Sequence, residues 1–413
     1  MTTVSELGQQ PDPERVGREL EKLFAEQRLS RRRFLGRGAS AVLMAGGLAS
    51  VLAACGIDGT AARNLRDLQA EAARVNHPRT AIGDWTFSNW PLYIDKSVIK
   101  DFNNKYGGHC KYVEEINDNN EFYGKVRQQL AQGVPIGRDI VTLTDYMASR
   151  WVRFGYVTPI DGRNVPNKRN LVPNLKSIGY DPRRQFTLPW QSGAIGIGYD
   201  IKQTGGEIRS VRDLFDPRWK GRVTMFSEPY DSAGTVLLGE GIDASRATLD
   251  QQLGAIERIG KANDAGQFRR FTGNDYTTDL TKGNIALALA YSGDLVQLQS
   301  DNPNLRFSYP EEGAMLFTDN MMMPSEVEHP YAAETMMNYV YEPSVAAVIC
   351  AYVNYLSPVD GIREILERSD PEIASNELIF PPDDVRRRLH SYPTFSTRQE
   401  QTMYEAMAKV TGA

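Results

Sequence analysis

The chain is poor in the residues from which most catalytic and metal sites are built. Its 413 residues include three cysteines and four histidines, and the histidines lie far apart in the sequence. There is no Cys-x-x-Cys pair, no His-Glu-x-x-His sequence and no glycine-rich phosphate-binding loop. A nucleophile–histidine–acid set is not recognisable either. These absences argue against a zinc site and against catalysis, so no metal, no cofactor and no enzymatic activity is predicted.

The charge balance excludes another class of partner. The formal net charge is −5 at pH 7, and part of the basic content lies within the first 54 residues, so the remainder is more acidic than the total suggests. An acidic chain is a poor partner for nucleic acid and is compatible with a cationic ligand. With 41% apolar and 24% charged residues the chain is ordinary globular protein, and residues 55–413 are enough for two lobes.

The N-terminal residues carry the strongest single signal. Residues 30–35 (SRRRFL) contain paired arginines, an uncharged run follows at 38–54, and residues 52–55 read LAAC. This order is typical of a twin-arginine export signal, and LAAC resembles a bacterial lipobox, whose cysteine carries lipid. The alternative is a transmembrane helix, but a run of 38–54 with three glycines is marginal for spanning a bilayer. We therefore predict a twin-arginine lipoprotein signal at 1–54 and lipidation of Cys55.

This signal implies a place for the protein and an organisation for its first residues. We expect it to lie outside the cytoplasm, lipid-anchored to the outer face of the cell membrane. Residues 55–82 are polar and are interpreted as a tether, with a charged helical patch at 61–75 that does not contribute to the core. Of the remaining cysteines, Cys110 and Cys350 are expected to be isolated buried thiols, although a disulfide between them is open outside the cell.

Strands and helices alternate along the rest of the chain. Apolar periodicity predicts strands and helices in alternation from residue 84 to residue 356, followed by a closing helix. The strands are expected at 85–89, 109–116, 139–143, 194–199, 222–225, 285–290, 306–309 and 320–323. The helices best defined by their apolar faces are expected at 91–106, 119–132, 147–154 and 398–410. This pattern indicates an α/β fold with a parallel or mixed sheet.

Six local sequences, in this order, resemble one family. They are NWPLYI at 89–94, DIV followed by TDY at 139–146, LPW leading to AIG at 188–196, LFDPRWKG at 214–221, YSGD at 291–294 and PEEGAMLFTD at 310–319. The family is that of the extracytoplasmic solute-binding proteins of polyamine (spermidine and putrescine) ABC importers. The resemblance covers about residues 85–356 and implies capture of a polyamine and delivery to a membrane permease. It also implies a monomer.

The same resemblance implies a fold of two α/β lobes joined by hinge strands, with the ligand cleft between them, the type II periplasmic-binding-protein fold. The chain is expected to cross between the lobes near residues 194, 291 and 341. Lobe 1 would then comprise 83–193 and 292–341, and lobe 2 would comprise 194–291 and 342–413.

The matched positions suit an organic cation. A polyamine needs carboxylates for its ammonium groups, because an unpaired buried charge is costly, and flat aromatic walls for its methylenes. The acids at matched positions are Asp231, Asp294 and Asp319. The aromatic residues are Trp90, Tyr93, Tyr146, Trp190 and Tyr291, and Thr144 could bond an amine through its hydroxyl.

Several of these residues could instead have a purely structural role. Tyr93 could belong to the core, and Thr144, Asp231 and Asp294 could cap helices. Pro91 and Leu92 stand where some family members have a small polar residue and an acid, so one amine contact is missing or comes from elsewhere, for which Asp145 is a candidate.

Two further functions stay open. In the first, the same fold binds another ligand, which could be a different cationic metabolite or an amino acid, or the protein could be a carrier of iron or sulfate. An anion binder would instead need arginines or helix N-termini facing the cleft. In the second, the protein is a membrane-tethered enzyme acting on cationic substrates.

Overall fold

The computed structural model describes residues 65–412, and Cys55 with the predicted signal lies outside them. Its strands join in one mixed sheet of order β2-β1-β3-β10-β5-β8-β6-β7, with β4 and β11 paired to β10 and β9 paired to β5. The strands are β1 (Asp84–Asn89), β2 (His109–Glu114), β3 (Ile140–Thr144), β4 (Val157–Thr158), β5 (Thr187–Asp200), β6 (Val223–Phe226), β7 (Phe268–Thr272), β8 (Leu287–Tyr291), β9 (Leu305–Ser308), β10 (Ala314–Pro324) and β11 (Leu389–His390).

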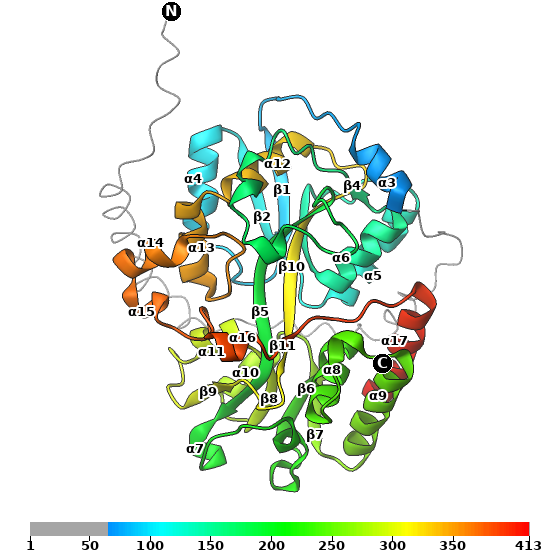
Figure 1. The fold of residues 1–413 in the computed structure, drawn as a ribbon, viewed down its shortest axis with the longest axis vertical. Coiled ribbons are helices and arrows are strands. Elements are labelled where there is room, and N and C mark those ends of the chain that lie inside the picture. The colour runs from blue at the N-terminus through cyan, green and yellow to red at the C-terminus, as the bar shows by residue number, and fades with distance from the viewer. Residues whose placement is uncertain (1–64, 413) are drawn as a thin grey trace, which may run out of the picture.

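Helices cover both faces of this sheet (Figure 1). They are α3 (Leu65–Ala72), α4 (Lys96–Tyr106), α5 (Asn119–Ala131), α6 (Asp145–Phe154), α7 (Ile201–Thr204), α8 (Pro229–Gly239), α9 (Leu249–Asp264), α10 (Tyr276–Thr281), α11 (Ser292–Leu298), α12 (Pro330–Tyr339), α13 (Pro343–Val353), α14 (Ile362–Ser369), α15 (Pro371–Ala374), α16 (Asp383–Arg386) and α17 (Thr397–Thr411). The predicted α/β alternation is confirmed.

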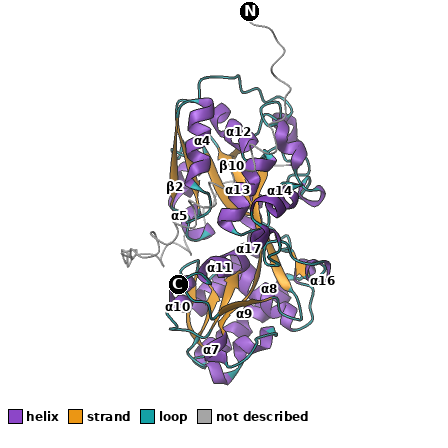
Figure 2. Cartoon of the chain, turned by 90° about the vertical axis from the view of Figure 1, so that its left-hand side faces the viewer, coloured by secondary structure: helices purple, strands orange, loops and turns teal. Residues whose placement is uncertain are grey.

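Two long strands carry the sheet from one lobe to the other. β5 and β10 run antiparallel through the middle of the molecule (Figure 1). At one end β10 also pairs with β3, and at the other end β5 also pairs with β8 and β9. Figure 2 shows the resulting two lobes, one above the other. We call the part built on β1 to β4 lobe 1 and the part built on β6 to β9 lobe 2.

The strand pairing corrects the predicted lobe boundaries. The crossing expected near residue 194 lies in β5, but the chain does not return at residue 291. Helix α11 packs on β8 and β9, and β9 pairs with the lobe 2 end of β5, so the return takes place along β10. Helix α13 packs on α4 of lobe 1, and the chain returns to lobe 2 with β11 and α17, where α17 packs on α9. Motif spacing could not reveal this, because pairing partners lie far apart in sequence.

Glycines in β5 allow other chain segments to approach its backbone closely. A Cβ atom placed on Gly193 would lie 2.5 Å from Cζ of Phe317, and one on Gly196 would lie 2.4 Å from the carbonyl oxygen of Ser308. Both separations are shorter than a carbon atom tolerates, so these positions need glycine. The space left beside Gly193 is filled by the rings of Phe317 and Tyr355, which both reach the region between the lobes.

The first helix of lobe 1 begins later than the sequence pattern predicted. The expected helix at 91–106 starts at Lys96, because the Asp95 side chain accepts a hydrogen bond from the Ser97 amide and caps the helix there. Leu92 has a φ of 56°, in the left-handed region that a leucine seldom adopts. Residues 91–94 therefore form a turn at the end of β1 rather than the first turn of a helix.

The segment before β1 is more closely attached to the body than predicted. Helix α3 forms within the expected helical patch, but Leu68 and Ala72 are buried and belong to the hydrophobic core. The expectation that this patch stays outside the core is therefore wrong, because its apolar residues at i and i+4 face the body. Within residues 65–412, none of the helices has the length and apolar character needed to cross a membrane.

The two cysteines of the body are free and buried, as predicted. Burial raises the pKa of the Cys350 thiol to about 12 and raises the pKa of the Cys110 thiol as well. Neither thiol is therefore suited to nucleophilic or redox chemistry.

The glycine requirement in β5 is open to test. We expect Gly196→Ala to lower the free energy of unfolding by about 1–3 kcal/mol, because the added methyl group overlaps the Ser308 carbonyl. Gly206→Ala is the matched control, since the position is open, and it should change stability by less than about 0.5 kcal/mol. Urea unfolding followed by circular dichroism measures both. Equal stability of the two variants would contradict the close approach at Gly196.

Candidate functional site

A cavity of about 560 Å³ lies between the lobes, and residues from both lobes line it. Trp90, Tyr93, Thr144 and Asp319 come from lobe 1 and from β10, and Asp231, Tyr291 and Asp294 come from lobe 2. The other lining residues are Pro91, Leu92, Asn117, Asn274, Asp275, Thr277, Thr278, Gln297, Leu298, Phe317, Tyr355 and Tyr392. Of the nine residues predicted to form the site, seven are thus brought together.

Asp319 is held by hydroxyl groups of lobe 1. The Tyr93 hydroxyl donates to Oδ2 at 2.8 Å, and the Thr144 hydroxyl donates to Oδ1 at 2.7 Å. The pairing of β10 with β3 sets Asp319 directly opposite Thr144. Burial raises the pKa of Asp319 to about 7, and the two hydrogen bonds offset only part of that increase. Tyr93 is therefore both a core residue and a cavity residue, which answers the alternative left open by the sequence.

Asp294 has a similar environment in lobe 2. The Tyr276 hydroxyl donates to Oδ2 and the Tyr355 hydroxyl donates to Oδ1, each at 2.8 Å. Burial raises the pKa of this carboxyl group to about 6. Asp294 lies in the first turn of α11, whose N-cap residue is Tyr291, so the side chain does not cap the helix.

Asp231, in the first turn of α8, adds a third acid, and its side chain is buried. Its Oδ1 accepts a hydrogen bond of 2.6 Å from the Tyr392 hydroxyl. Burial raises its pKa, and repulsion from Asp118 and Asp319 acts in the same direction. The N-cap of α8 is Glu228 rather than Asp231. The capping alternative for Asp231 is therefore excluded, and its carboxylate faces the cavity.

The polar partners of these acids are neutral. Each receives hydrogen bonds from tyrosine or threonine hydroxyl groups, and none of the described residues that line the cavity is an arginine, a lysine or a histidine. Three carboxyl groups that line one cavity without a basic side chain among its described lining residues raise one another's cost of ionisation. The arrangement can therefore bind a positively charged group strongly, and it is poorly suited to an anion.

Aromatic rings form the walls of the cavity. Tyr291 stacks on Phe226 with centroids 4.5 Å apart, and Phe317 meets Tyr291 edge-on at 5.3 Å. Trp90 is half-buried, and its indole N–H donates to the Thr142 carbonyl at 3.0 Å, which fixes the ring beside the cavity. Such faces accommodate methylene groups and attract cations.

Two predicted site residues lie outside the cavity lining. Trp190 is buried behind Tyr93, with ring centroids 6.3 Å apart, and thus supports that residue. Tyr146 stacks on Tyr230 at 4.9 Å and lines a separate pocket of about 240 Å³. Asp145 lines that second pocket too and accepts hydrogen bonds from Tyr180 and Asn320. Asp145 is thus not among the residues that line the cavity between the lobes.

Sequence reasoning missed three aromatic residues of the cavity. Phe317 stands two residues before Asp319 in the same family motif, so a signal was available. Tyr355 and Tyr392 come from the C-terminal region, where no motif was recognised. Both donate hydrogen bonds to the acids of lobe 2, and only the three-dimensional structure brings them there.

Contacts across the cleft hold the lobes together in this structure. The Asn120 amide of α5 donates to Glu228 of α8 at 2.8 Å, and Arg150 of α6 lies 3.2 Å from Glu400 of α17. Burial raises the pKa of Glu228, and Asp231 and Asp118 raise it further. The closed arrangement thus gathers acidic groups that repel one another unless a cation or a proton lies between them.

The acids make a specific prediction for the ligand-free protein. Their folded-state pKa values lie above the unfolded values, so their favourable contribution is present at low pH and is lost as the pH rises through about 6 (Asp294) and 7 (Asp319). We therefore expect the double variant Asp294→Asn/Asp319→Asn to gain stability relative to the wild type as the pH rises, so that the difference in the free energy of unfolding is more in its favour at pH 8 than at pH 5. Urea unfolding of ligand-free protein at both pH values measures this. A stability difference independent of pH would show that the acids ionise normally.

Comparison with known proteins agrees with this geometry. The model of the family described as bacterial extracellular solute-binding protein matches residues 138–379, more than half of the chain. The putrescine-binding periplasmic protein PotF of Escherichia coli is 28% identical over 343 residues, which cover 78% of this chain and 90% of that protein. These matches confirm the resemblance found in the sequence motifs.

Solved structures share the fold. A putative spermidine/putrescine ABC transporter protein from Listeria monocytogenes superposes with a TM-score of 0.70 at 23% identity, covering 79% of this chain and 98% of that one. The binding protein AgtB of A. tumefaciens R10, solved with agropinic acid, gives a TM-score of 0.63 at 16% identity over 79% and 96% of the chains. The two-lobe fold is confirmed, and the matched family is one of solute-binding proteins and not of enzymes. The chain belongs to the bacterial extracellular solute-binding protein family.

Proposed function

We propose that this protein captures polyamines, putrescine or spermidine, outside the cytoplasm and delivers them to the permease of an ABC importer. The observation that supports the proposal is a set of three acids, buried Asp231 and Asp319 and half-buried Asp294, which line one aromatic cavity without a basic side chain among its described lining residues. Ammonium groups would supply the missing positive charge. Among the relatives, PotF is named for putrescine binding.

The chemistry of a polyamine matches the distribution of groups around the cavity. Its terminal amines carry a full charge at neutral pH, and its methylene chain is apolar. The acids would pair with the amines, Tyr93 and Thr144 would orient Asp319, and Trp90 and Tyr291 would pack against the methylenes. A cavity of about 560 Å³ falls within the usual range for small-molecule sites.

Closure follows from where the acids are attached. Asp231 and Asp294 belong to lobe 2, whereas Asp319 lies opposite β3 of lobe 1. A ligand with two ammonium groups would contact both lobes only when they are closed, so it would stabilise the closed state. The closed form would then be the one that the permease receives.

The proposed location rests on the N-terminal sequence. Residues 1–54 would direct export by the twin-arginine route, and lipid on Cys55 would hold the protein at the outer face of the membrane. We further propose that it acts as a monomer. The family is described as extracellular, and the PotF relative is periplasmic, which supports the location.

The acids should determine affinity. We expect Asp294→Asn and Asp319→Asn each to weaken putrescine or spermidine binding by about 2–5 kcal/mol, because each leaves an ammonium group without its carboxylate partner. Asp275→Asn is the matched control: this acid also lines the cavity, but it is exposed and paired with Arg270, so its loss should cost less than about 1 kcal/mol. Calorimetry on protein freed of ligand by unfolding and refolding measures all three.

The same titrations decide between ligand classes. A panel of putrescine, spermidine, an uncharged amino acid and sulfate should yield binding for the polyamines. Binding of the amino acid or of sulfate alone would contradict the polyamine proposal while leaving the family assignment intact.

Binding should also depend on pH. Protons compete with the ligand for Asp294 and Asp319, whose pKa values are about 6 and 7 without a ligand. Affinity for putrescine is therefore expected to rise from pH 5 to pH 8 and then to level off, since amines of this kind keep their charge to about pH 10. Affinity that stays constant or falls over this range would contradict carboxylate–ammonium pairing.

A further inference from the structure

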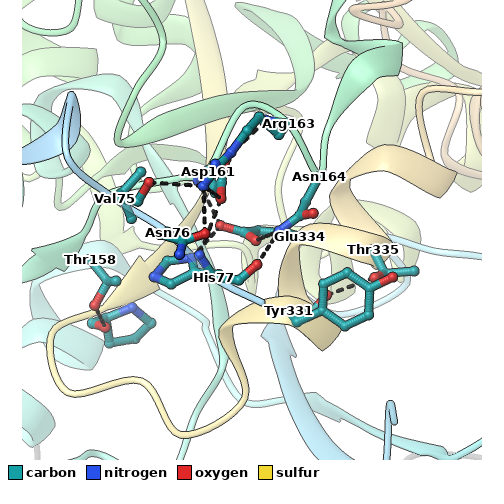
Figure 3. A network of polar contacts seen from close by, with 11 residues as sticks. Val75, Asn76, His77, Thr158, Asp161, Arg163, Asn164, Tyr331, Glu334 and Thr335 are labelled. Carbon is teal, nitrogen blue, oxygen red and sulfur yellow. Dashed lines mark hydrogen bonds and ion pairs between the residues drawn. The ribbon is translucent and has the colours of Figure 1, made fainter. Parts of the chain in front are cut away.

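The residues that precede β1 are fastened to lobe 1 by a polar network (Figure 3). His77 Nδ1 lies 2.6 Å from Oε1 of Glu334 on α12, and the His77 amide donates to Asp161 Oδ2 at 3.1 Å. The Asn164 side-chain amide donates to the His77 carbonyl at 2.9 Å. The main-chain N–H, the main-chain carbonyl and the ring Nδ1 of His77 are thus all engaged.

Glu334 is the centre of this network. It is fully buried, and besides His77 it accepts hydrogen bonds from the Asp161 amide at 2.7 Å and from the Asn164 side chain at 2.8 Å. A buried carboxylate needs several such partners. His77 supplies one of them, so release of the N-terminal segment would leave Glu334 with an incomplete set.

Further contacts extend this attachment toward the N-terminus. Arg163 Nη2 donates to the Asn76 side chain at 2.7 Å and to the Val75 carbonyl at 3.2 Å. On α3, Leu68 and Ala72 are buried in the core. We call residues 65–77 the docking segment.

All of these partners belong to lobe 1. Residues 161–164 follow β4, which pairs with the lobe 1 end of β10, and α12 packs on β1. Figure 1 shows α3 on the right-hand flank of lobe 1, well above β6 and β7 of lobe 2. Opening and closing of the cleft therefore need not disturb the docking segment.

We propose that the docking segment is a fixed mount, by which a membrane attachment at Cys55 holds lobe 1 close to the bilayer while lobe 2 remains free to move. This inference rests on the lipid attachment proposed above. With the segment docked, nine residues (56–64) separate Cys55 from the body, whereas 28 residues (56–83) would separate it from β1 if the segment were released. Fully extended, the connection 56–64 spans about 32 Å at most, and the connection 56–83 spans about 100 Å at most.

The shorter connection has a consequence for delivery. The effective concentration of a tethered protein near its membrane partner falls roughly as the −3/2 power of the linker length. Shortening the connection from 28 to nine residues raises it roughly fivefold. Attachment through lobe 1 alone also presents the protein to a permease in a restricted set of orientations.

Hydrogen exchange of the full chain with Cys55→Ser tests the docking. Amides of α3 should be protected at least about tenfold over an unstructured peptide. Leu68→Asp/His77→Ala should abolish that protection and leave β5 and putrescine binding unchanged. Ala70→Asp is the matched control, because Ala70 is on the exposed face of the same helix, and it should keep the protection. Unprotected α3 amides in the parent chain, or equal protection in both variants, would overturn the proposal.

A second measurement tests the mount on the membrane. The protein with Cys55 carries a donor dye either at Lys176→Cys in lobe 1 or at Asp264→Cys in lobe 2, and energy transfer to an acceptor lipid in vesicles is measured for each. Cys110 and Cys350 are buried and should not react with the dye. Leu68→Asp/His77→Ala should decrease transfer from lobe 1, and transfer unaffected by this change would overturn the mount. If Cys55→Ser leaves the protein on the vesicles, the lipid attachment fails while the docking, judged by hydrogen exchange, stands.

Discussion

The structure depends on one unfavourable interaction, the burial of like-charged carboxyl groups around a single cavity. Asp231 and Asp319 are almost fully buried and Asp294 is half-buried, and the groups that donate hydrogen bonds to them are hydroxyls, which carry no compensating charge. In water these groups would be ionised at neutral pH. In the cavity their pKa values are raised, which is a measure of how strongly the site favours a cation. The proposed ligand affinity and the proposed domain closure both depend on this imbalance.

The fold supplies this arrangement through its two shared strands. β10 carries Asp319 to a position opposite Thr144 of lobe 1, while α8 and α11 extend from strands of lobe 2 and present Asp231 and Asp294 in their first turns. Acidic side chains near helix N-termini are also stabilised by the helix dipole. Glycines in β5 allow Phe317 and Tyr355 to pack beside the strand. Local sequence, packing and site chemistry are therefore connected through the same few residues.

Much of this could be predicted from the sequence, for identifiable reasons. Buried strands such as β3 and β8 appear as short apolar runs, and the three acids follow or interrupt such runs, where a carboxylate is unexpected unless it is functional. The lobe boundaries were harder, because β9 and α13 reveal their lobe only through pairing and packing with distant segments. Tyr355 and Tyr392 were not predicted, since a tyrosine in a C-terminal loop carries no local sign of its hydrogen-bond partner. Trp190 and Tyr146 were predicted in the cavity and instead lie just outside its lining.

The central claim is that the acids of the cavity have raised pKa values that a cationic ligand lowers. Carbon-13 NMR of aspartate-labelled protein, with Asp294→Asn and Asp319→Asn used to assign the signals, measures this directly. Without ligand, the carboxyl carbons of Asp294 and Asp319 should titrate with midpoints near 6 and 7. With saturating putrescine the midpoints should move below about 4. Midpoints near 4 in the free protein, or midpoints that do not move when putrescine binds, would contradict the account.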